Sequence, residues 1–258
     1  MADVPLVRAI VVMPTRGVVV AELLQALVNN AEGHRLILRM VNRETVDVAR
    51  NRLAAEAIAA ADDPALFAPG TDPYVFWIDS DAFFVRGTLT LMMRTLERHP
   101  SIDVLAALFG PRVAKSGAAA FRSLSDRHSV LIPGVNCKRG EVVDVEQVGF
   151  HFTLHRVSLL RALGPNPFGE PSENTSDDAA FCWRIHAGKG RMAVATGIPV
   201  FHVDERNGAA YTPGVDAAVI DGDTIDATRL PDELPFESRA YGDRIDPIVR
   251  DPSRRLLF

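Results

Sequence analysis

The sequence predicts an α/β domain whose mostly parallel central sheet is covered by helices on both faces. Three observations lead to this prediction. Apolar, β-branched segments alternate with segments of helical periodicity over the first ~110 residues. One of these segments, from Tyr74 to Ile78, is apolar at every position, which is typical of a strand buried on both faces. It ends in Asp79-Ser80-Asp81, and open α/β sheets bind ligands at the carboxyl ends of their strands.

The individual elements follow from the same patterns. The first part of the chain is expected to contain strands over 6–13, 36–41, 74–78 and 102–108, and helices over 19–30, 46–57 and 88–98. Pro14-Thr15-Arg16-Gly17 is the expected loop after the first strand. Beyond Gly110 the alternation weakens, with a strand expected over 142–148, helices over 157–163 and 178–187, and short strands over 192–195 and 199–201. The loop 166–175 is expected to be mobile.

Composition excludes several classes of protein. The net charge of -5 over 258 residues gives no overall basic field, so non-specific nucleic-acid binding is not expected from charge. No apolar run approaches the ~20 residues that span a bilayer, and the first residues lack a signal-peptide pattern. Cys137 and Cys182 have no metal-binding or redox spacing. We therefore expect a cytoplasmic protein with reduced thiols and no membrane span.

Asp79 and Asp81 are the strongest chemical signal in the sequence. Unpaired buried charge is costly, so packing does not explain two carboxylates at a strand end. Carboxylate oxygens suit Mg²⁺ or Mn²⁺, and such an ion would bridge to a diphosphate. The alternative is a solvated turn at the start of the next helix.

Five segments together resemble glycosyltransferases of the GT-A fold, family 2-like, of the phage and bacterial type. Asp79-Ser80-Asp81 resembles their D-x-D motif, and Val48-Ala49-Arg50-Asn51-Arg52-Leu53 resembles their A-R-N-x-L helix. The other three are Gln147-Val148-Gly149-Phe150-His151-Phe152, Asp177-Asp178-Ala179-Ala180-Phe181-Cys182-Trp183-Arg184, and Ile198-Pro199-Val200-Phe201-His202. With the first loop, the resemblance covers about 190 residues. One departure is Asp177, where Glu is commoner.

The resemblance implies a role for each segment. Thr15 and Arg16 would lie near the base or ribose of a nucleotide-sugar donor, with Arg50 near its diphosphate and Gly149 facing its sugar. Asp81 and His202 would hold Mn²⁺ or Mg²⁺, and Asp79 would reach either the metal or the ribose. Asp178 would be the general base of an inverting reaction. His151 and His155 are not assigned to the metal site.

Several alternatives stay open. If Asp178 is structural, a retaining reaction becomes possible, and Asp177 and Asp178 also suit a helix N-terminus. A haloacid-dehalogenase-like phosphohydrolase and a catalytically silent sugar-nucleotide-binding module are the competing functions. The donor expected from the resemblance is a UDP-sugar, whereas the acceptor is a glycan, a protein, a small molecule or a modified nucleobase. Residues 1–203 would form the catalytic domain and 204–258 a polar arm or lid.

Overall fold

The architecture is that of a computed structural model, which describes residues 7–15, 17–31, 34–84, 86–109, 120–122, 130–131, 140–169 and 176–204, with the short strands 209–211, 218–220, 223–225 and 248–249. Within these ranges no helix combines the length and the apolar character that crossing a bilayer requires.

Helices and strands alternate along the first half of the chain, as the sequence predicts. In order, the elements there are β1 (Val7–Thr15), α1 (Ala21–Ala31), β2 (His34–Asn42), α2 (Val46–Asp62), β3 (Tyr74–Ile78), β4 (Ala82–Phe84), α3 (Thr88–Arg98) and β5 (Val104–Phe109). They are followed by β6 (Ala120–Arg122), β7 (Val130–Leu131), β8 (Val142–Val145), β9 (Gln147–Val148), β10 (Phe152–Arg156), α4 (Val157–Leu163), α5 (Asp177–Ala187) and β11 (Met192–Asp204). Four short strands end the series: β12 (Ala209–Tyr211), β13 (Ala218–Ile220), β14 (Asp223–Ile225) and β15 (Ile248–Val249).

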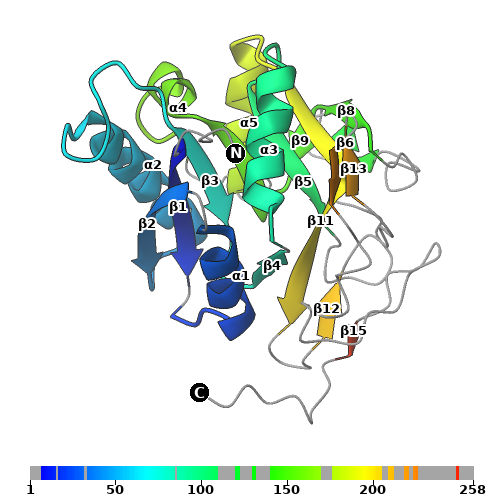
Figure 1. Cartoon of the computed structure of the whole chain (residues 1–258). Coiled ribbons are helices and arrows are strands. Elements are labelled where there is room, and N and C mark those ends of the chain that lie inside the picture. The colour runs from blue at the N-terminus through cyan, green and yellow to red at the C-terminus, as the bar shows by residue number, and fades with distance from the viewer. Residues whose placement is uncertain are drawn as a thin grey trace, which may run out of the picture.

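The central sheet is mostly parallel, and its strands lie in the order β2-β1-β3-β10-β5-β11 (Figure 1). β1 pairs in parallel with β2 and β3, and β5 pairs in parallel with β11. β10 is antiparallel to both of its neighbours, β3 and β5. Five of these six strands therefore run in one direction, and β10 runs against them.

The antiparallel strand β10 was not predicted from the sequence. Its residues, Phe-Thr-Leu-His-Arg, include a threonine and a histidine, which hide the apolar character expected of a central strand. Phe152 and Leu154 contribute to the core on one face of the sheet, and Thr153 and His155 are fully buried as well. A strand of mixed composition thus occupies the middle of the sheet, where helices cover both faces.

Some predicted boundaries were wrong. Pro14 and Thr15 belong to β1, because its pairing with β2 continues to Asn42. The strand predicted over 142–148 is two strands that pair with different partners, β8 with β11 and β9 with β6. The two strands predicted over 192–201 are one, because β11 continues past a register shift between Ala195 and Pro199. Helices α3 and α4 have the predicted bounds.

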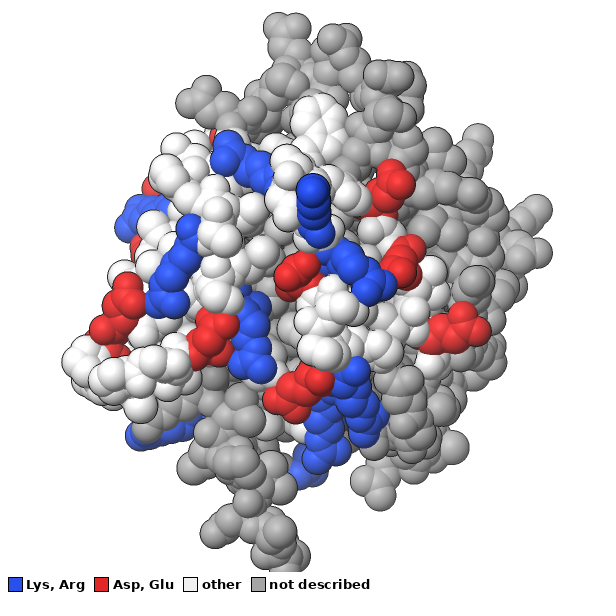
Figure 2. Space-filling view, turned by 90° about the horizontal axis from the view of Figure 1, so that it is seen from above, with Lys and Arg blue, Asp and Glu red and all other residues white. Residues whose placement is uncertain are grey.

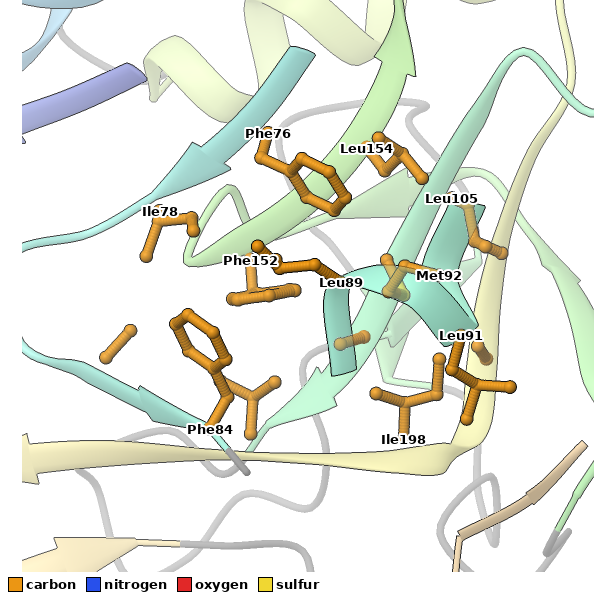
Figure 3. Packing of buried hydrophobic residues seen from close by; sticks show 14 of the residues in the cluster. Phe76, Ile78, Phe84, Leu89, Leu91, Met92, Leu105, Phe152, Leu154 and Ile198 are labelled. Atoms are coloured by element: carbon orange, nitrogen blue, oxygen red, sulfur yellow. The ribbon is translucent and has the colours of Figure 1, made fainter. Parts of the chain in front are cut away.

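Two hydrophobic layers enclose the sheet. One layer packs α1 and α3 against the sheet, and its members include Leu89, Met92 and Phe152, which Figure 3 shows in close contact. The other layer packs α2, α4 and α5 against the opposite face around Trp77. Together they bury more than 50 apolar side chains, a core that stabilises a domain of this size. The helices therefore cover both faces of the sheet, as predicted.

The surface at the amino ends of the strands carries charges of both signs. Figure 2 views the molecule from this side and shows basic and acidic side chains interspersed among uncharged ones. Exposed ion pairs on the described surface join Arg161 to Asp62 and Arg191 to Asp144. The face in view thus has no continuous basic field, in keeping with the overall charge.

A buried polar pair joins β3 to β10 inside the core. The Trp77 indole N–H donates to Nε2 of His155 at 2.7 Å, and Nδ1 of His155 lies 2.8 Å from the carbonyl of Arg156, to which it can only donate. A ring that donates through Nδ1 and accepts through Nε2 is neutral. Burial lowers the pKa of His155 to about 4, although the Arg156 carbonyl and Asp72 act in the opposite direction.

This pair predicts a pH-dependent part of the stability. The folded imidazole stays neutral above pH ~4, whereas the unfolded chain takes up its proton below ~6.5, so protons favour unfolding between these values. Stability is therefore complete above pH 6.5 and falls by about 2 kcal/mol at pH 5 through this group alone. We expect His155→Gln to lose less stability than the wild type between pH 7 and pH 5 in urea unfolding. The control His186→Gln, at an exposed position, should keep the wild-type slope.

Candidate functional site

Strand register brings distant carboxylates and imidazoles to one edge of the sheet. Phe152 of β10 pairs with Ile78 of β3, so His151 comes to lie opposite Asp79, whose N–H donates to the His151 carbonyl at 3.0 Å. The short strand β4 pairs with β11, with Ala82 opposite His202, so Asp81 lies beside His202. Because β10 runs against its neighbours, its amino end lies beside the carboxyl ends of β3 and β5.

Asp81, His151 and His202 form a group that could hold a metal ion. One ligand atom from each residue lies within 4.8 Å of the others. Asp81 Oδ2 is 3.2 Å from His202 Nε2, and Asp81 Oδ1 is 3.5 Å from His151 Nδ1. The two imidazole rings lie 4.3 Å apart between centroids. A carboxylate and two imidazoles at this spacing are chemically suited to a divalent cation.

The environment of His151 determines which of its nitrogens faces this group. Its Nε2 lies 3.3 Å from the carbonyl oxygen of Phe201, and a carbonyl can only accept, so Nε2 carries the proton. The Nδ1 atom therefore faces Asp79 and Asp81, at 3.6 and 3.5 Å. The side chain is 2% exposed, and Nδ1 has no hydrogen bond among the residues that the structure describes. A metal ion would satisfy this buried atom, and the residues present therefore fit such an ion.

A second group of charges surrounds Arg50 of α2. Its guanidinium contacts Asp177 and Asp178 through Nη1 and lies 3.3 Å from Asp79 through Nη2. The Arg50 side chain is only 5% exposed, whereas the three carboxylates keep 15–30% of their surface. Asp79 Oδ1 faces Arg50 and Asp79 Oδ2 faces His151, so Asp79 connects the two groups.

The carboxylates of this group have very different proton affinities. Burial raises the pKa of Asp178 to about 6, with help from Asp177 and Asp79, against the opposing effect of Arg50. Burial would also raise the pKa of Asp79, but Arg50 and the neighbouring imidazoles lower it to about 2. Burial would lower the pKa of Arg50, yet the three carboxylates raise it further. Asp178 is thus the carboxylate whose pKa lies nearest to neutrality.

Aromatic rings and an amide hold the Arg50 side chain in place. The guanidinium carbon lies 5.5 Å from the centroid of the Phe150 ring and 5.7 Å from that of Phe168. The neighbouring Asn51 accepts from the Phe168 N–H at 2.9 Å and donates to the Gly169 carbonyl at 3.1 Å. Of these two consecutive residues of α2, Asn51 therefore contacts Phe168 and Gly169, and Arg50 contacts the start of α5. The first part of the loop predicted over 166–175 is held by these contacts, and 170–175 lie outside the described residues.

The predicted donor-binding residues lie in different surroundings. The Thr15 hydroxyl donates to the Val18 carbonyl at 2.9 Å and accepts from the Gly17 N–H at 3.1 Å, so it shapes the turn after β1. Gly17 has φ +107°, and a Cβ atom there would approach Asn42 to 3.3 Å. Gly149 is partly buried directly before Phe150, whose N–H donates to Asp178 at 3.3 Å. Arg16 lies outside the described residues.

His151 is the site residue that the sequence analysis left unassigned. The signal that could have found it is its position directly before Phe152, if Phe152–Arg156 had been predicted as an antiparallel strand next to β3. His155, four residues later, is part of the core through Trp77 and takes no part in the site. Asp79, Asp81, His202, Asp178 and Arg50 all come together at one edge, although they are up to 152 positions apart in the chain.

Comparisons with known proteins support the fold. No known protein family matches the sequence, and no curated protein matches it. Among solved structures, A197 from STIV is similar, with a TM-score of 0.59 and 15% identity over 84% of this chain and 96% of that chain. S. aureus TarS 1–349 is similar at a TM-score of 0.37 and 14% identity, over 73% of this chain and 58% of that one. The A197 match confirms the mixed α/β architecture with a largely parallel sheet that was predicted for a GT-A domain.

The ion-pair group around Arg50 predicts unequal roles for two neighbouring arginines of α2. Arg50→Met should lower the free energy of unfolding by on the order of 3 kcal/mol, because it leaves three partly buried carboxylates without their cation. Arg52→Met should have little effect, since the Arg52 side chain is 59% exposed and pairs with the partly exposed Glu44 and Glu56. Urea unfolding of both variants tests this. Equal losses in the two variants would show that Arg50 acts only as a helix residue.

Proposed function

We propose that this chain is a glycosyltransferase that moves a sugar from a nucleotide diphosphate sugar to an acceptor hydroxyl, with a divalent ion as cofactor and with inversion at the anomeric carbon. One observation carries the proposal. A group that could hold a metal ion, Asp81, His151 and His202, lies beside a carboxylate of raised pKa, Asp178, with Asp79 and Arg50 between them. The motifs that resemble the GT-A enzymes supply these residues, and the donor that the resemblance favours is a UDP-sugar.

The ion would be held by Asp81, His151 and His202. When bound, it supplies positive charge that stabilises the negative charge developing on the leaving diphosphate. Asp79 lies between this group and Arg50, and Arg50 keeps it ionised by lowering its pKa to about 2 against the effect of burial. The oxygens of Asp79 can therefore accept a hydrogen bond from a hydroxyl group of the nucleotide sugar. The turn of Thr15 and Gly17 is linked to the D-x-D segment by the Val20 N–H, which donates to the Ser80 carbonyl at 3.0 Å.

Asp178 is assigned the role of general base. Its Oδ2 accepts the Phe150 N–H and its Oδ1 contacts Arg50, so the carboxylate is oriented by two donors. Its side chain keeps 25% of its surface exposed, against 15% for Asp177, so an acceptor can reach it more readily. In the proposed step the acceptor oxygen forms a bond to the anomeric carbon, its proton passes to Asp178, and the bonding electrons of the donor leave with the diphosphate.

Metal removal tests the transferase proposal directly. Incubation with UDP-sugars and Mn²⁺ should release a nucleoside diphosphate. Exhaustive treatment with EDTA should abolish this release, because EDTA removes the ion that Asp81, His151 and His202 would hold. Restoring Mn²⁺ should restore the rate. Release that survives EDTA would contradict the metal role. Release of phosphate from simple phosphomonoesters would instead favour a phosphohydrolase.

Asp178 and its neighbour Asp177 form a matched pair of test positions. Asp178→Asn should lower kcat by ~10²–10⁴-fold with donor affinity nearly unchanged, because an amide retains the size of the side chain but cannot take a proton. Asp177→Asn should be milder, since Asp177 contacts Arg50 but not the Phe150 N–H. The pKa of about 6 further predicts that the wild-type rate falls below pH 6 as Asp178 becomes protonated.

Two results would overturn the assignment of the base. One is an Asp178→Asn variant with near-normal kcat. The other is a product of retained anomeric configuration, determined by NMR, which would move Asp178 to substrate positioning.

A further inference from the structure

We propose that the group formed by Asp81, His151 and His202 selects a divalent transition-metal ion and discriminates against Mg²⁺. The sequence alone predicts Mn²⁺ or Mg²⁺ without distinguishing them, because it offers two aspartates and one histidine. The inference rests on the metal-dependent activity proposed above and specifies the class of ion that this activity would use.

The chemistry of the donor atoms carries the first step. Two of the three candidate ligand atoms are imidazole nitrogens and only one is a carboxylate oxygen. Mg²⁺ is bound in proteins by oxygen ligands and retains much of its water, whereas imidazole nitrogen suits ions such as Zn²⁺, Co²⁺ and Fe²⁺. Affinity for one set of ligands generally rises along the first transition series from Mn²⁺ through Co²⁺. A site with two nitrogens among three ligands therefore favours the transition metals.

The hydrogen bond of His151 carries the second step. Because Nε2 lies 3.3 Å from the Phe201 carbonyl, Nδ1 faces the carboxylates of Asp79 and Asp81, and the side chain is almost fully buried. Nδ1 of His151 is buried and has no hydrogen-bond partner among the described residues. A carbonyl that orients a histidine in this way also increases the basicity of its other nitrogen. His151 is thus prepared as a metal ligand before any ion arrives.

The position of Asp79 carries the third step. Asp79 would supply the second carboxylate of an oxygen-rich site, but its Oδ1 lies 3.3 Å from Arg50 Nη2. Arg50 is buried and pairs with three carboxylates among the described residues, one of them Asp79, so moving Asp79 fully onto an ion would weaken that ion pair. Asp79 therefore lies next to the metal group without belonging to it, and the nitrogen ligands dominate the site.

Direct binding measurements on the full chain, without any donor, test the selectivity. Mn²⁺ can be followed by the electron paramagnetic resonance signal of the free ion, and Co²⁺, Zn²⁺ and Mg²⁺ by calorimetry and by competition with Mn²⁺. We expect Co²⁺ and Zn²⁺ to displace Mn²⁺, and Mg²⁺ to bind at least ~10-fold more weakly than Mn²⁺. Equal affinities for Mg²⁺ and Mn²⁺ would overturn the proposal, and this measurement needs no variant.

A substitution at position 151 tests the role of the nitrogen. His151→Asp places a carboxylate oxygen close to the position of Nδ1, so it should narrow the ratio of Mn²⁺ to Mg²⁺ affinity. His202→Gln, at a more exposed position, should weaken Mn²⁺ binding by more than ~10-fold through loss of a ligand. Asp79→Asn should weaken it less than Asp81→Asn does, and the control His186→Gln should not change it. An unchanged metal ratio in a folded His151→Asp variant would overturn the assignment of His151.

The two proposals can fail separately. Selective Mn²⁺ binding without release of any nucleoside diphosphate would refute the transferase and leave the metal inference in place. Metal-dependent release of a nucleoside diphosphate with equal affinities for Mg²⁺ and Mn²⁺ would refute the metal inference and leave the transferase in place.

Discussion

The site depends on one buried cation, the Arg50 guanidinium, and on the three carboxylates around it. An arginine with 5% exposure is tolerated only when its charge is matched, and Asp79, Asp177 and Asp178 provide that match. The converse also holds, because three carboxylates would repel one another at this spacing without the guanidinium. The pairing joins α2, the end of β3 and the start of α5.

The direction of one strand explains why the metal group exists. Parallel strands place their carboxyl ends at a common edge, which accounts for Asp79, Asp81 and His202. β10 is antiparallel to its neighbours, so the residue before its first position lies at the same edge. That residue is His151. An antiparallel strand inside an otherwise parallel sheet thus adds a ligand from its amino end to those from the carboxyl ends of the others.

The two halves of the site, the group around Arg50 and the group of Asp81, His151 and His202, differ in the charges that they contain. The Arg50 group already contains its cation. Burial, together with the charges of Asp177 and Asp79, raises the pKa of Asp178 to about 6, while Arg50 lowers the pKa of Asp79. The Asp81 group contains one carboxylate and two imidazoles, and Nε2 of His151 faces the Phe201 carbonyl. Asp79 lies beside both halves, so a change in the charge of either half changes the electrostatic potential at the Asp79 carboxylate.

The sequence by itself determined the alternation of strands and helices, the buried strand β3, the bounds of α3 and α4, and the chemical character of Asp79, Asp81, Asp178 and His202. These depend on local patterns, namely apolar periodicity and short motifs. Tertiary structure alone decided that β10 crosses the sheet centre, that His151 rather than His155 faces the carboxylates, and that Arg50 neutralises Asp79, Asp177 and Asp178. The physical reason is that register, strand direction and charge pairing depend on contacts between segments up to 128 positions apart. A local sequence pattern contains information on the structure of its own segment only.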